Sequence, residues 1–543
     1  GRVLGPRTQA LRAGGIGSAD LAGQLAAQPD VEWAVVDHRR RATAGVPNDP
    51  LFQNNLTTTT PTVGQWYLRA PDGAAVSAIN ALGAWSTNTG SSSVVVAVVD
   101  TGVRFDHPDL VAKLLPGYDF VSSTDDTPGD RDADASDPGD WTAASSSCGA
   151  GDSSWHGTQV SGLIAAATDN GIGMAGTARD VMLLPVRVLG KCGGYDSDII
   201  AGMRWAGGIA SVPTTNPHPA KVINMSLGST GVCEQAYIDA IADLNTAKVT
   251  VVVAAGNENG TAVGTPANCP GAIAVGGLRH VGTKVGYSNL GPQVAISAPA
   301  GNCVNDSGLC LYPLLTTINL GSTTPSSNGY SDGVNYSVGT SFSAPLVSGA
   351  VALLLSVDPS LTPAQMRTAL TSAATAFPTQ PAGSTVPVCR APNSIEQIEC
   401  YCTTSTCGAG MLNVAAAIAA LTPTNGLPPI GAIATSTSTP TPGQAVVLSG
   451  SGSTAIAGRS IVGYAWSVVP GYGTGAASFV GANSGSSVTL NPTAAGTVLV
   501  QLTVTDSAGA SNSKTRLLTI SGATSGGGSA GDPADSGGGG GAM

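Results

Sequence analysis

Short runs of consecutive apolar residues, in which apolar and polar positions do not alternate, recur through the first half of the chain. The first covers residues 93–99 and ends at Asp100. Because successive side chains of a strand point to opposite faces, such a run predicts a strand buried on both faces, as in a parallel sheet covered by helices. The same pattern predicts further strands at 181–188, 221–225, 249–254 and 272–275.

Stretches suited to helices separate these strands. We expect helices at 75–85, 158–167, 196–206 and 234–245. Strands that alternate with helices predict a doubly wound α/β fold with a mostly parallel sheet and right-handed crossovers. Ligands of such folds bind beyond the carboxyl ends of the strands, and Asp100 and Asn257 stand at or just past two such ends.

The pattern changes after residue 421. Residues 422–429 have the Pro- and Gly-containing composition of a linker. From 430 to 521, turn residues punctuate short strands, which is typical of a β-sandwich domain. These strands are expected at 445–449, 461–468, 487–490 and 496–506. The Gly- and Ser-rich stretch 522–543 is expected to be disordered.

Residues 1–41 differ from the α/β domain that we expect at 42–421. They contain a candidate helix at 21–28 and a candidate strand at 31–37. The three arginines at 39–41 would form an exposed cleavage site.

Composition narrows the class of protein. A chain of 543 residues is too long for one core, so at least two domains are expected. A net charge of -11 without a basic cluster beyond the three arginines argues against nucleic-acid binding. Ten cysteines without a C-x-x-C pair favour disulfides over zinc, and therefore export to an oxidising compartment. No run of eighteen apolar residues and no signal peptide occur, so we expect a processed export product without a transmembrane segment.

Four short motifs carry polar groups that acyl transfer requires. Asp100 ends a strand, His156 begins a helix, Asn257 follows a strand, and Ser341 lies at a corner before the apolar run 346–355. Taken singly, each has a plain structural explanation as a cap or turn residue. Together they supply the carboxylate, imidazole, amide donor and hydroxyl of nucleophilic catalysis.

The sequence around these residues resembles the signature blocks of the subtilisin-like serine proteases, or subtilases, in the same order. The blocks are Asp100-Thr-Gly, His156-Gly-Thr-x-Val-x-Gly, Ala255-Gly-Asn257 and Gly339-Thr-Ser341-x-x-Ala-Pro345, and the likeness covers about residues 46–420. It implies a secreted bacterial endopeptidase in which Ser341 attacks, His156 transfers the proton, Asp100 orients His156, and Asn257 helps to bind the oxyanion. The alternative is a catalytically silent member that binds a surface through its β-domain.

The resemblance also implies a cleft for protein or peptide substrates. Its lining residues would be Gly193, Gly194, Ser226, Leu227, Gly228, Ala254, Ala255, Gly256 and Gly264. Such small residues would leave a roomy, uncharged P1 pocket for large apolar side chains. Asp196 would either influence the P4 position or cap the following helix. Residues 1–41 would be the end of a propeptide, which acts as inhibitor and chaperone of a monomeric enzyme.

A structural calcium ion, without a catalytic cofactor, is a further implication of the resemblance. Its ligands would be Asp49, Asp109, Thr168, Asn170, Ile172 and Met174. The acidic loop 124–140 is a candidate for a second ion, because like charges at this density repel unless they are solvated or neutralised. The candidate ligands are Asp130, Asp132, Asp134 and Asp137, and a plain solvated loop is the alternative.

Spacing along the subtilase-like sequence suggests five disulfides. We expect Cys303–Cys310, Cys148–Cys192, Cys233–Cys269, and two bridges among Cys389, Cys400, Cys402 and Cys407. Residues 430–521 resemble a PKD or related immunoglobulin-like domain, which would bind a surface or act as a spacer.

Overall fold

The computed structural model divides the chain into two compact units, Gly1–Gly45 and Val46–Met543. The described residues are 2–5, 8–11, 13, 18–31, 34, 46–53, 58–122, 132–210, 214–303, 307–421, 426–456 and 458–522.

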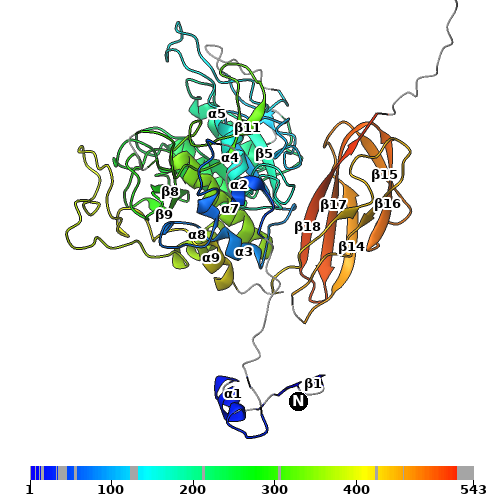
Figure 1. The fold of residues 1–543 in the computed structure, drawn as a ribbon. Helices are drawn as coiled ribbons and strands as arrows, with labels where there is room; N and C mark the ends of the chain where they lie inside the picture. Colours follow the sequence, from blue (N-terminus) through cyan, green and yellow to red (C-terminus); the bar gives the residue numbers. More distant parts are fainter. Residues whose placement is uncertain are drawn as a thin grey trace, which may run out of the picture. The chain divides into compact units, whose positions relative to one another are not determined.

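The first unit contains a hairpin and one helix (Figure 1). Strands β1 (Arg2–Gly5) and β2 (Thr8–Ala10) pair antiparallel, and helix α1 spans Ser18–Ala26. The helix predicted at 21–28 is therefore present, with an earlier start. Of the predicted strand 31–37 only positions 31 and 34 are described, and the three arginines lie outside the described residues.

A seven-stranded parallel sheet forms the centre of the second unit. Its order is β4-β5-β3-β6-β7-β8-β9, which confirms the doubly wound fold. The strands are β3 (Val95–Asp100), β4 (Tyr118–Asp119), β5 (Met182–Arg187), β6 (Val222–Met225), β7 (Thr250–Ala254), β8 (Ile273–Leu278) and β9 (Val294–Pro299). The sequence did not predict β4, which is two residues long, or β9, whose serine and proline interrupt the apolar run.

Helices cover both faces of this sheet. The helices that contact its strands are α4 (His156–Ala165), α5 (Asp196–Ala206), α6 (Gln235–Thr246), α7 (Thr340–Val357) and α8 (Pro363–Ser372). The second unit also contains α2 (Pro50–Gln53), α9 (Val414–Ala420) and the 3-10 helix η1 (Trp66–Leu68). Alternate strand residues such as Val186 and Val251 pack with Met203 of α5 and Ile241 of α6 in one buried cluster. Helix α7 packs on the strands from β6 to β9 and against α4, and neither α4 nor α7 contributes to that cluster. The three predicted helices between strands are confirmed.

Two helices differ from simple expectation. The prediction of a helix at 75–85 is wrong in extent, because α3 spans only Ala81–Trp85. Asn80, the residue before α3, has a left-handed backbone with φ 56°. Helix α7 is long and apolar enough to cross a membrane by composition, but 94% of it is buried within the protein, so it is a core helix.

The C-terminal part is an antiparallel β-sandwich, as predicted. One sheet has the order β12-β13-β16-β15 and the other β14-β17-β18. The strands are β12 (Ala434–Thr435), β13 (Val446–Ser449), β14 (Ile461–Val468), β15 (Ala476–Val480), β16 (Ser487–Ala494), β17 (Gly496–Asp506) and β18 (Ser511–Ile520). Trp466, Leu490 and Leu502 lie in the core between the sheets. The predicted disordered tail lies outside the described residues from 523 onward.

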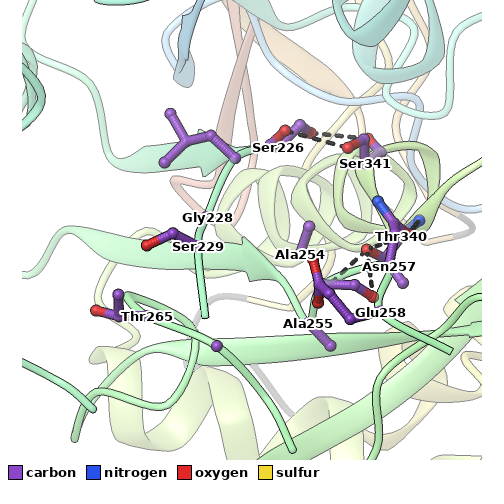
Figure 2. A pocket seen from close by; sticks show the side chains of 13 residues that line it. Ser226, Gly228, Ser229, Ala254, Ala255, Asn257, Glu258, Thr265, Thr340 and Ser341 are labelled. Carbon is purple, nitrogen blue, oxygen red and sulfur yellow. Dashed lines mark hydrogen bonds between the residues drawn. The ribbon is translucent and has the colours of Figure 1, made fainter. Parts of the chain in front are cut away.

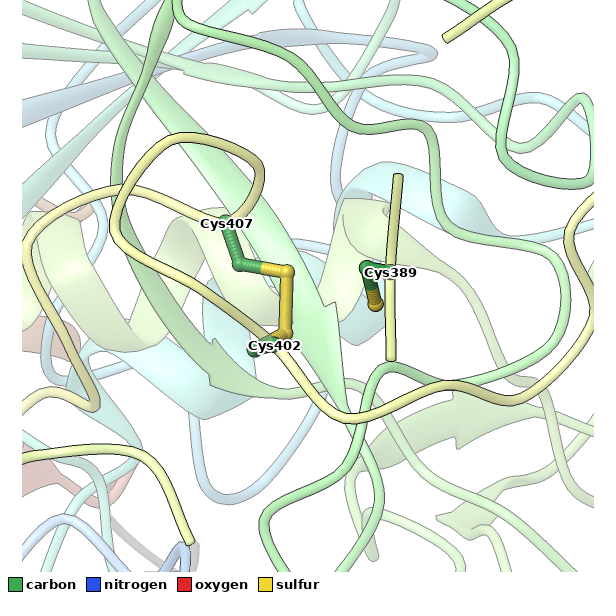
Figure 3. Close-up of side chains that lie close together, drawn as sticks. All are labelled: Cys389, Cys402 and Cys407. Atoms are coloured by element: carbon green, nitrogen blue, oxygen red, sulfur yellow. A yellow bond between two sulfur atoms is a disulfide. The ribbon is translucent and has the colours of Figure 1, made fainter. Parts of the chain in front are cut away.

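All ten cysteines are paired, which confirms the expected disulfides. The bridges are Cys148–Cys192, Cys233–Cys269, Cys303–Cys310, Cys389–Cys400 and Cys402–Cys407. The sulfur atoms of Cys389, Cys402 and Cys407 gather within 4.8 Å of one another (Figure 3). Because each sulfur is bound in a disulfide, the cluster offers no thiolate ligands for a metal.

Candidate active site

Asp100 and His156 form a hydrogen-bonded pair at the carboxyl edge of the sheet. Asp100 is the last residue of β3 and is fully buried, and His156 is the first residue of α4. Imidazole Nδ1 lies 2.8 Å from Asp100 Oδ1, which also accepts the main-chain N–H of Thr101 at 2.8 Å. Because a carboxylate can only accept, the pair favours the tautomer with hydrogen on Nδ1, which leaves Nε2 free to accept a proton.

The pKa of His156 is raised above its ordinary value. Burial lowers the pKa, because it disfavours the charged imidazolium. The carboxylate of Asp100, through its charge and its hydrogen bond, and the charges of Asp140 and Asp137 together outweigh this effect. The imidazole is therefore a stronger base than an isolated histidine.

Ser341 lies in the first turn of α7, where unpaired N–H groups favour negative charge. Its hydroxyl donates to the main-chain carbonyl of Ser226 at 3.1 Å, and the Ser226 hydroxyl donates to the carbonyl of Ser341 at 2.7 Å. Ser341 and His156 line the same cavity, and the ring of Phe342 lies 5.8 Å from the imidazole. The structure thus brings the predicted nucleophile and base into one cavity, with the hydroxyl turned toward Ser226.

Asn257 is held in a fixed orientation beyond the end of β7. Its Oδ1 accepts the main-chain N–H of Thr340 at 2.9 Å and the Thr340 hydroxyl at 3.1 Å. Since both contacts use the oxygen, the Nδ2 hydrogens point away from Thr340. Figure 2 shows Asn257 beside Thr340 and on the same side of the pocket as Ser341.

A cavity of about 150 Å³ lies beside Ser341 (Figure 2). Seven of the predicted cleft residues line it: Ser226, Leu227, Gly228, Ala254, Ala255, Gly256 and Gly264. A side chain at position 264 would bring its Cβ to 2.2 Å from the carbonyl oxygen of Ser229, so this wall requires glycine.

Sequence reasoning missed a carboxylate in this pocket. Glu258 lines the cavity, and its carboxylate accepts a hydrogen bond from the side-chain amide of Asn289. The N–H of Glu258 in turn donates to Asn289 Oδ1 at 2.9 Å. Its position directly after Asn257 is the signal in the sequence that could have identified it.

A larger cavity of about 580 Å³ borders Ser341 and His156. Sequence reasoning missed its outer wall, the segment 334–338, where Val334 and Tyr336 are exposed. Asp332 organises this segment, because its Oδ1 accepts the N–H groups of Val334 and Asn335, each at 2.7 Å.

The remaining predicted cleft residues lie on a different segment. Gly193 and Gly194 are exposed, outside the residues that line the two cavities, and Gly193 pairs with Gly190 through two main-chain hydrogen bonds. Asp196 does not cap α5 with its side chain, because its carboxylate accepts the hydroxyl of Tyr237 at 2.7 Å.

The exposed bridge Cys148–Cys192 joins this segment to the loop before His156. The ammonium of Lys191 also donates to the carbonyl of Asp152, at 2.6 Å. The two segments are therefore linked both covalently and by a hydrogen bond.

Four of the six residues predicted for the first calcium ion, Asp49, Asp109, Asn170 and Met174, come together around two fully buried carboxylates. Asp109 accepts the Asn170 amide at 2.7 Å and the N–H of Met174 at 2.9 Å, and Asp49 accepts the N–H groups of Asp169 and Asn170. Burial raises the pKa of Asp49 and of Asp109 to about 6 in each case. Two desolvated carboxylates beside an amide side chain fit the oxygen ligands that Ca²⁺ prefers.

The acidic loop is arranged differently. Asp132 and Asp134 are exposed, and each accepts a main-chain N–H of its own loop. Asp137 is buried and accepts the hydroxyl of Thr101 at 3.1 Å. Asp130 lies outside the described residues. The second calcium ion stays a prediction.

Comparison with known proteins places this site in a family. Residues 91–392, more than half of the chain, match the model of the subtilase family, and residues 435–520 match the model of a PKD domain. An extracellular protease of Xanthomonas campestris pv. campestris is 41% identical over 406 residues, which is 73% of this chain and 60% of that protein. An extracellular basic protease of Dichelobacter nodosus is 38% identical over 358 residues, which is 63% of this chain and 54% of that protein.

A solved structure gives a consistent result. A protease from Pseudoalteromonas arctica is 40% identical and aligns with a TM-score of 0.58, covering 69% of this chain and 99% of that one. The matched region spans 54–60% of the length of the two curated relatives. With its Asp100–His156 pair at the edge of a parallel sheet and a matching family model, the chain belongs to the subtilase family.

Proposed function

We propose that this protein is a secreted serine endopeptidase. The observation that carries the proposal is the 2.8 Å contact of Asp100 with His156, which lines one cavity together with Ser341. Secretion is supported by the five disulfides and by relatives described as extracellular proteases.

In the proposed mechanism, the Ser341 hydroxyl turns from Ser226 toward Nε2 of His156 and attacks the peptide carbonyl carbon. His156 takes the hydroxyl proton and then gives it to the leaving amine. Asp100 holds the imidazole by Nδ1 and stabilises the imidazolium, which fits the raised pKa of His156. Asn257 Nδ2 and the main-chain N–H of Ser341 would donate to the oxyanion of the tetrahedral intermediate.

The cavity beside Ser341 would receive the P1 side chain. Its wall of small residues would leave room for a large apolar side chain, and Glu258 would in addition attract the charged end of a basic residue. The substrate backbone would pair as an extended strand with 193–194 and 226–228, where glycine permits close approach.

Other proposals follow from family membership. Subtilases generally bind structural calcium, and Asp49, Asp109 and Asn170 would hold such an ion by side chain, with carbonyls of Thr168, Ile172 and Met174. A bound ion would supply charge compensation to the buried carboxylates. Residues 1–41 would be the remnant of an inhibitory propeptide, and the enzyme would act as a monomer.

Casein hydrolysis by the wild-type chain and by Ser341→Ala tests this function. We expect the wild-type chain to hydrolyse casein and a serine-directed phosphonate to abolish the activity. Ser341→Ala should lose at least ~10³-fold in rate, while Ser360→Ala, an exposed serine outside the two cavities, should retain full activity. A folded wild-type chain that leaves casein intact and does not react with the phosphonate would instead be the catalytically silent alternative.

A further inference from the structure

Helix α4 lacks a cap from its own N-cap residue. Trp155 occupies that position with a left-handed backbone, φ 52°, and its side chain makes no cap hydrogen bond. Its indole N–H donates instead to the carbonyl of Gly321 at 2.7 Å. The first N–H groups of α4, which belong to His156 and Gly157, therefore need other acceptors.

Two hydroxyl groups supply these acceptors. The N–H of His156 donates to Ser154 Oγ at 3.3 Å, and the N–H of Gly157 donates to Thr101 Oγ1 at 3.1 Å. Ser154 precedes the helix and Thr101 follows the catalytic Asp100 on the neighbouring strand. The cap is thus divided between two separate segments.

Each hydroxyl is fixed in turn by a buried carboxylate. Ser154 Oγ donates to Asp140 Oδ2 at 2.7 Å, and the N–H of Ser154 donates to Asp140 Oδ1 at 2.6 Å. Thr101 Oγ1 donates to Asp137 Oδ2 at 3.1 Å. Since each hydroxyl hydrogen points to a carboxylate, the oxygen lone pairs face the helix N–H groups. Asp137 is 0% and Asp140 3% exposed.

The segment that carries the two carboxylates is itself held firmly. The N–H of Asp137 donates to the carbonyl of Val103 at 3.1 Å, and the guanidinium of Arg104 donates to the carbonyl of Asp137 at 2.9 Å. At Gly139, with φ +100°, an added Cβ would lie 1.9 Å from the carbonyl oxygen of Thr323. The carboxylates therefore sit on a fixed backbone.

We propose that Asp137 and Asp140 are positioning residues for His156, which cap helix α4 through the hydroxyls of Thr101 and Ser154, and that the carboxylate of Asp140 also stabilises the imidazolium formed during proton transfer. This inference rests on the proposed protease function. The charged groups that face this region are Asp100 from β3, Asp137 and Asp140 from the loop, Arg104, which donates to the carbonyl of Asp137, and Arg187 from β5, which acts on Asp137 and pairs with Asp119. Burial and the neighbouring Asp140 raise the pKa of Asp137 to about 7, so Asp137 contributes chiefly through its hydrogen bond to Thr101. The raised pKa of His156 agrees with the negative charge that these carboxylates place near the imidazole.

Three variants separate the effect of the helix cap from the effect of the Asp140 charge. Their activity is measured with a tetrapeptide anilide. The rates are normalised to the concentration of active sites, which is titrated with a phosphonate. Ser154→Ala breaks one hydrogen-bond relay and keeps the charge, so kcat should fall about tenfold with little change in KM and in the acid limb of the pH profile. Asp140→Asn removes the charge, so the acid limb should also move about 0.3–0.5 unit to lower pH. Asp140→Glu keeps the charge and should keep the acid limb.

The matched control is Asp239→Asn, which makes the same charge change at an exposed position of α6, outside the two cavities. We expect its kcat and acid limb to equal those of the wild type. The proposal is overturned if Ser154→Ala and Asp140→Asn keep kcat within twofold, or if Asp239→Asn moves the acid limb as far as Asp140→Asn. A wild-type chain without phosphonate-titratable sites would overturn the protease function itself, which is a distinct result.

Discussion

The proposed oxyanion donor offers a graded test, because Asn257 and the residue that anchors it, Thr340, can be altered separately. Removing the corresponding donor from subtilisin costs about 2.7–4 kcal/mol of transition-state stabilisation, and we adopt that size for Asn257→Ala, a fall of about 10²–10³ in kcat. Since the oxyanion exists only after attack, KM should change little.

Thr340→Val should have a smaller effect. It removes the 3.1 Å hydrogen bond to Asn257 Oδ1 and keeps the 2.9 Å bond from the main-chain N–H. The hydroxyl also contacts Gly256, whose N–H lies 3.2 Å from it. The loss of one of the two hydrogen bonds between neutral groups that orient Asn257 should cost about 0.5–1.5 kcal/mol of transition-state stabilisation, so kcat should fall about 2- to 12-fold.

The assay is kcat and KM on a tetrapeptide anilide, normalised by active-site titration, with Thr340→Ser as a control that keeps the hydroxyl. An unchanged kcat in Asn257→Ala would remove Asn257 from the mechanism. A loss in Thr340→Val as large as that in Asn257→Ala would refute the reasoning that the main-chain N–H alone keeps most of the orientation.

Three further predictions concern the pocket, the base and the calcium site. Glu258→Gln should lower kcat/KM about 5- to 10-fold for substrates with P1 Lys and less than twofold for P1 Phe, and equal losses on both would contradict a charge effect. Because the pKa of His156 is raised above 6.5, kcat/KM should be lost as pH falls through a value above 6.5; an acid limb below 6.5 would contradict this. Excess EDTA should lower Tm by about 5–10 °C, reversibly with added calcium, and EDTA should have little effect on Asp109→Asn; an unchanged wild-type Tm would count against the site.

The sequence predicted those parts of the site that depend on short local motifs. Asp100 and Asn257 follow apolar strands, and parallel strands bring their carboxyl ends to one edge, so the topology alone places these residues together. The length of α3 was mispredicted, because the left-handed backbone of Asn80 has no counterpart in the apolar pattern.

The long loops were not predictable in the same way. The relay from Asp140 through Ser154, and the wall at 334–338, depend on contacts between segments that are far apart in the chain. Counting acidic residues suggested a metal-binding loop or a plain solvated one, whereas the structure shows that Asp137 and Asp140 point inward to hydroxyl groups. Composition records how many carboxylates a loop has and does not record which way they face.

The Cys148–Cys192 bridge couples the loop that leads to His156 with the segment that would guide the substrate backbone. Both cysteines are exposed, so a mild reductant reaches this link before the other four bridges, each of which includes at least one buried cysteine. Reduction of this disulfide would let the loop before His156 and the segment around Gly193 move more freely relative to each other, while the sheet beneath stays folded. Catalytic competence and global folding would then have different sensitivities to the redox state of the surroundings.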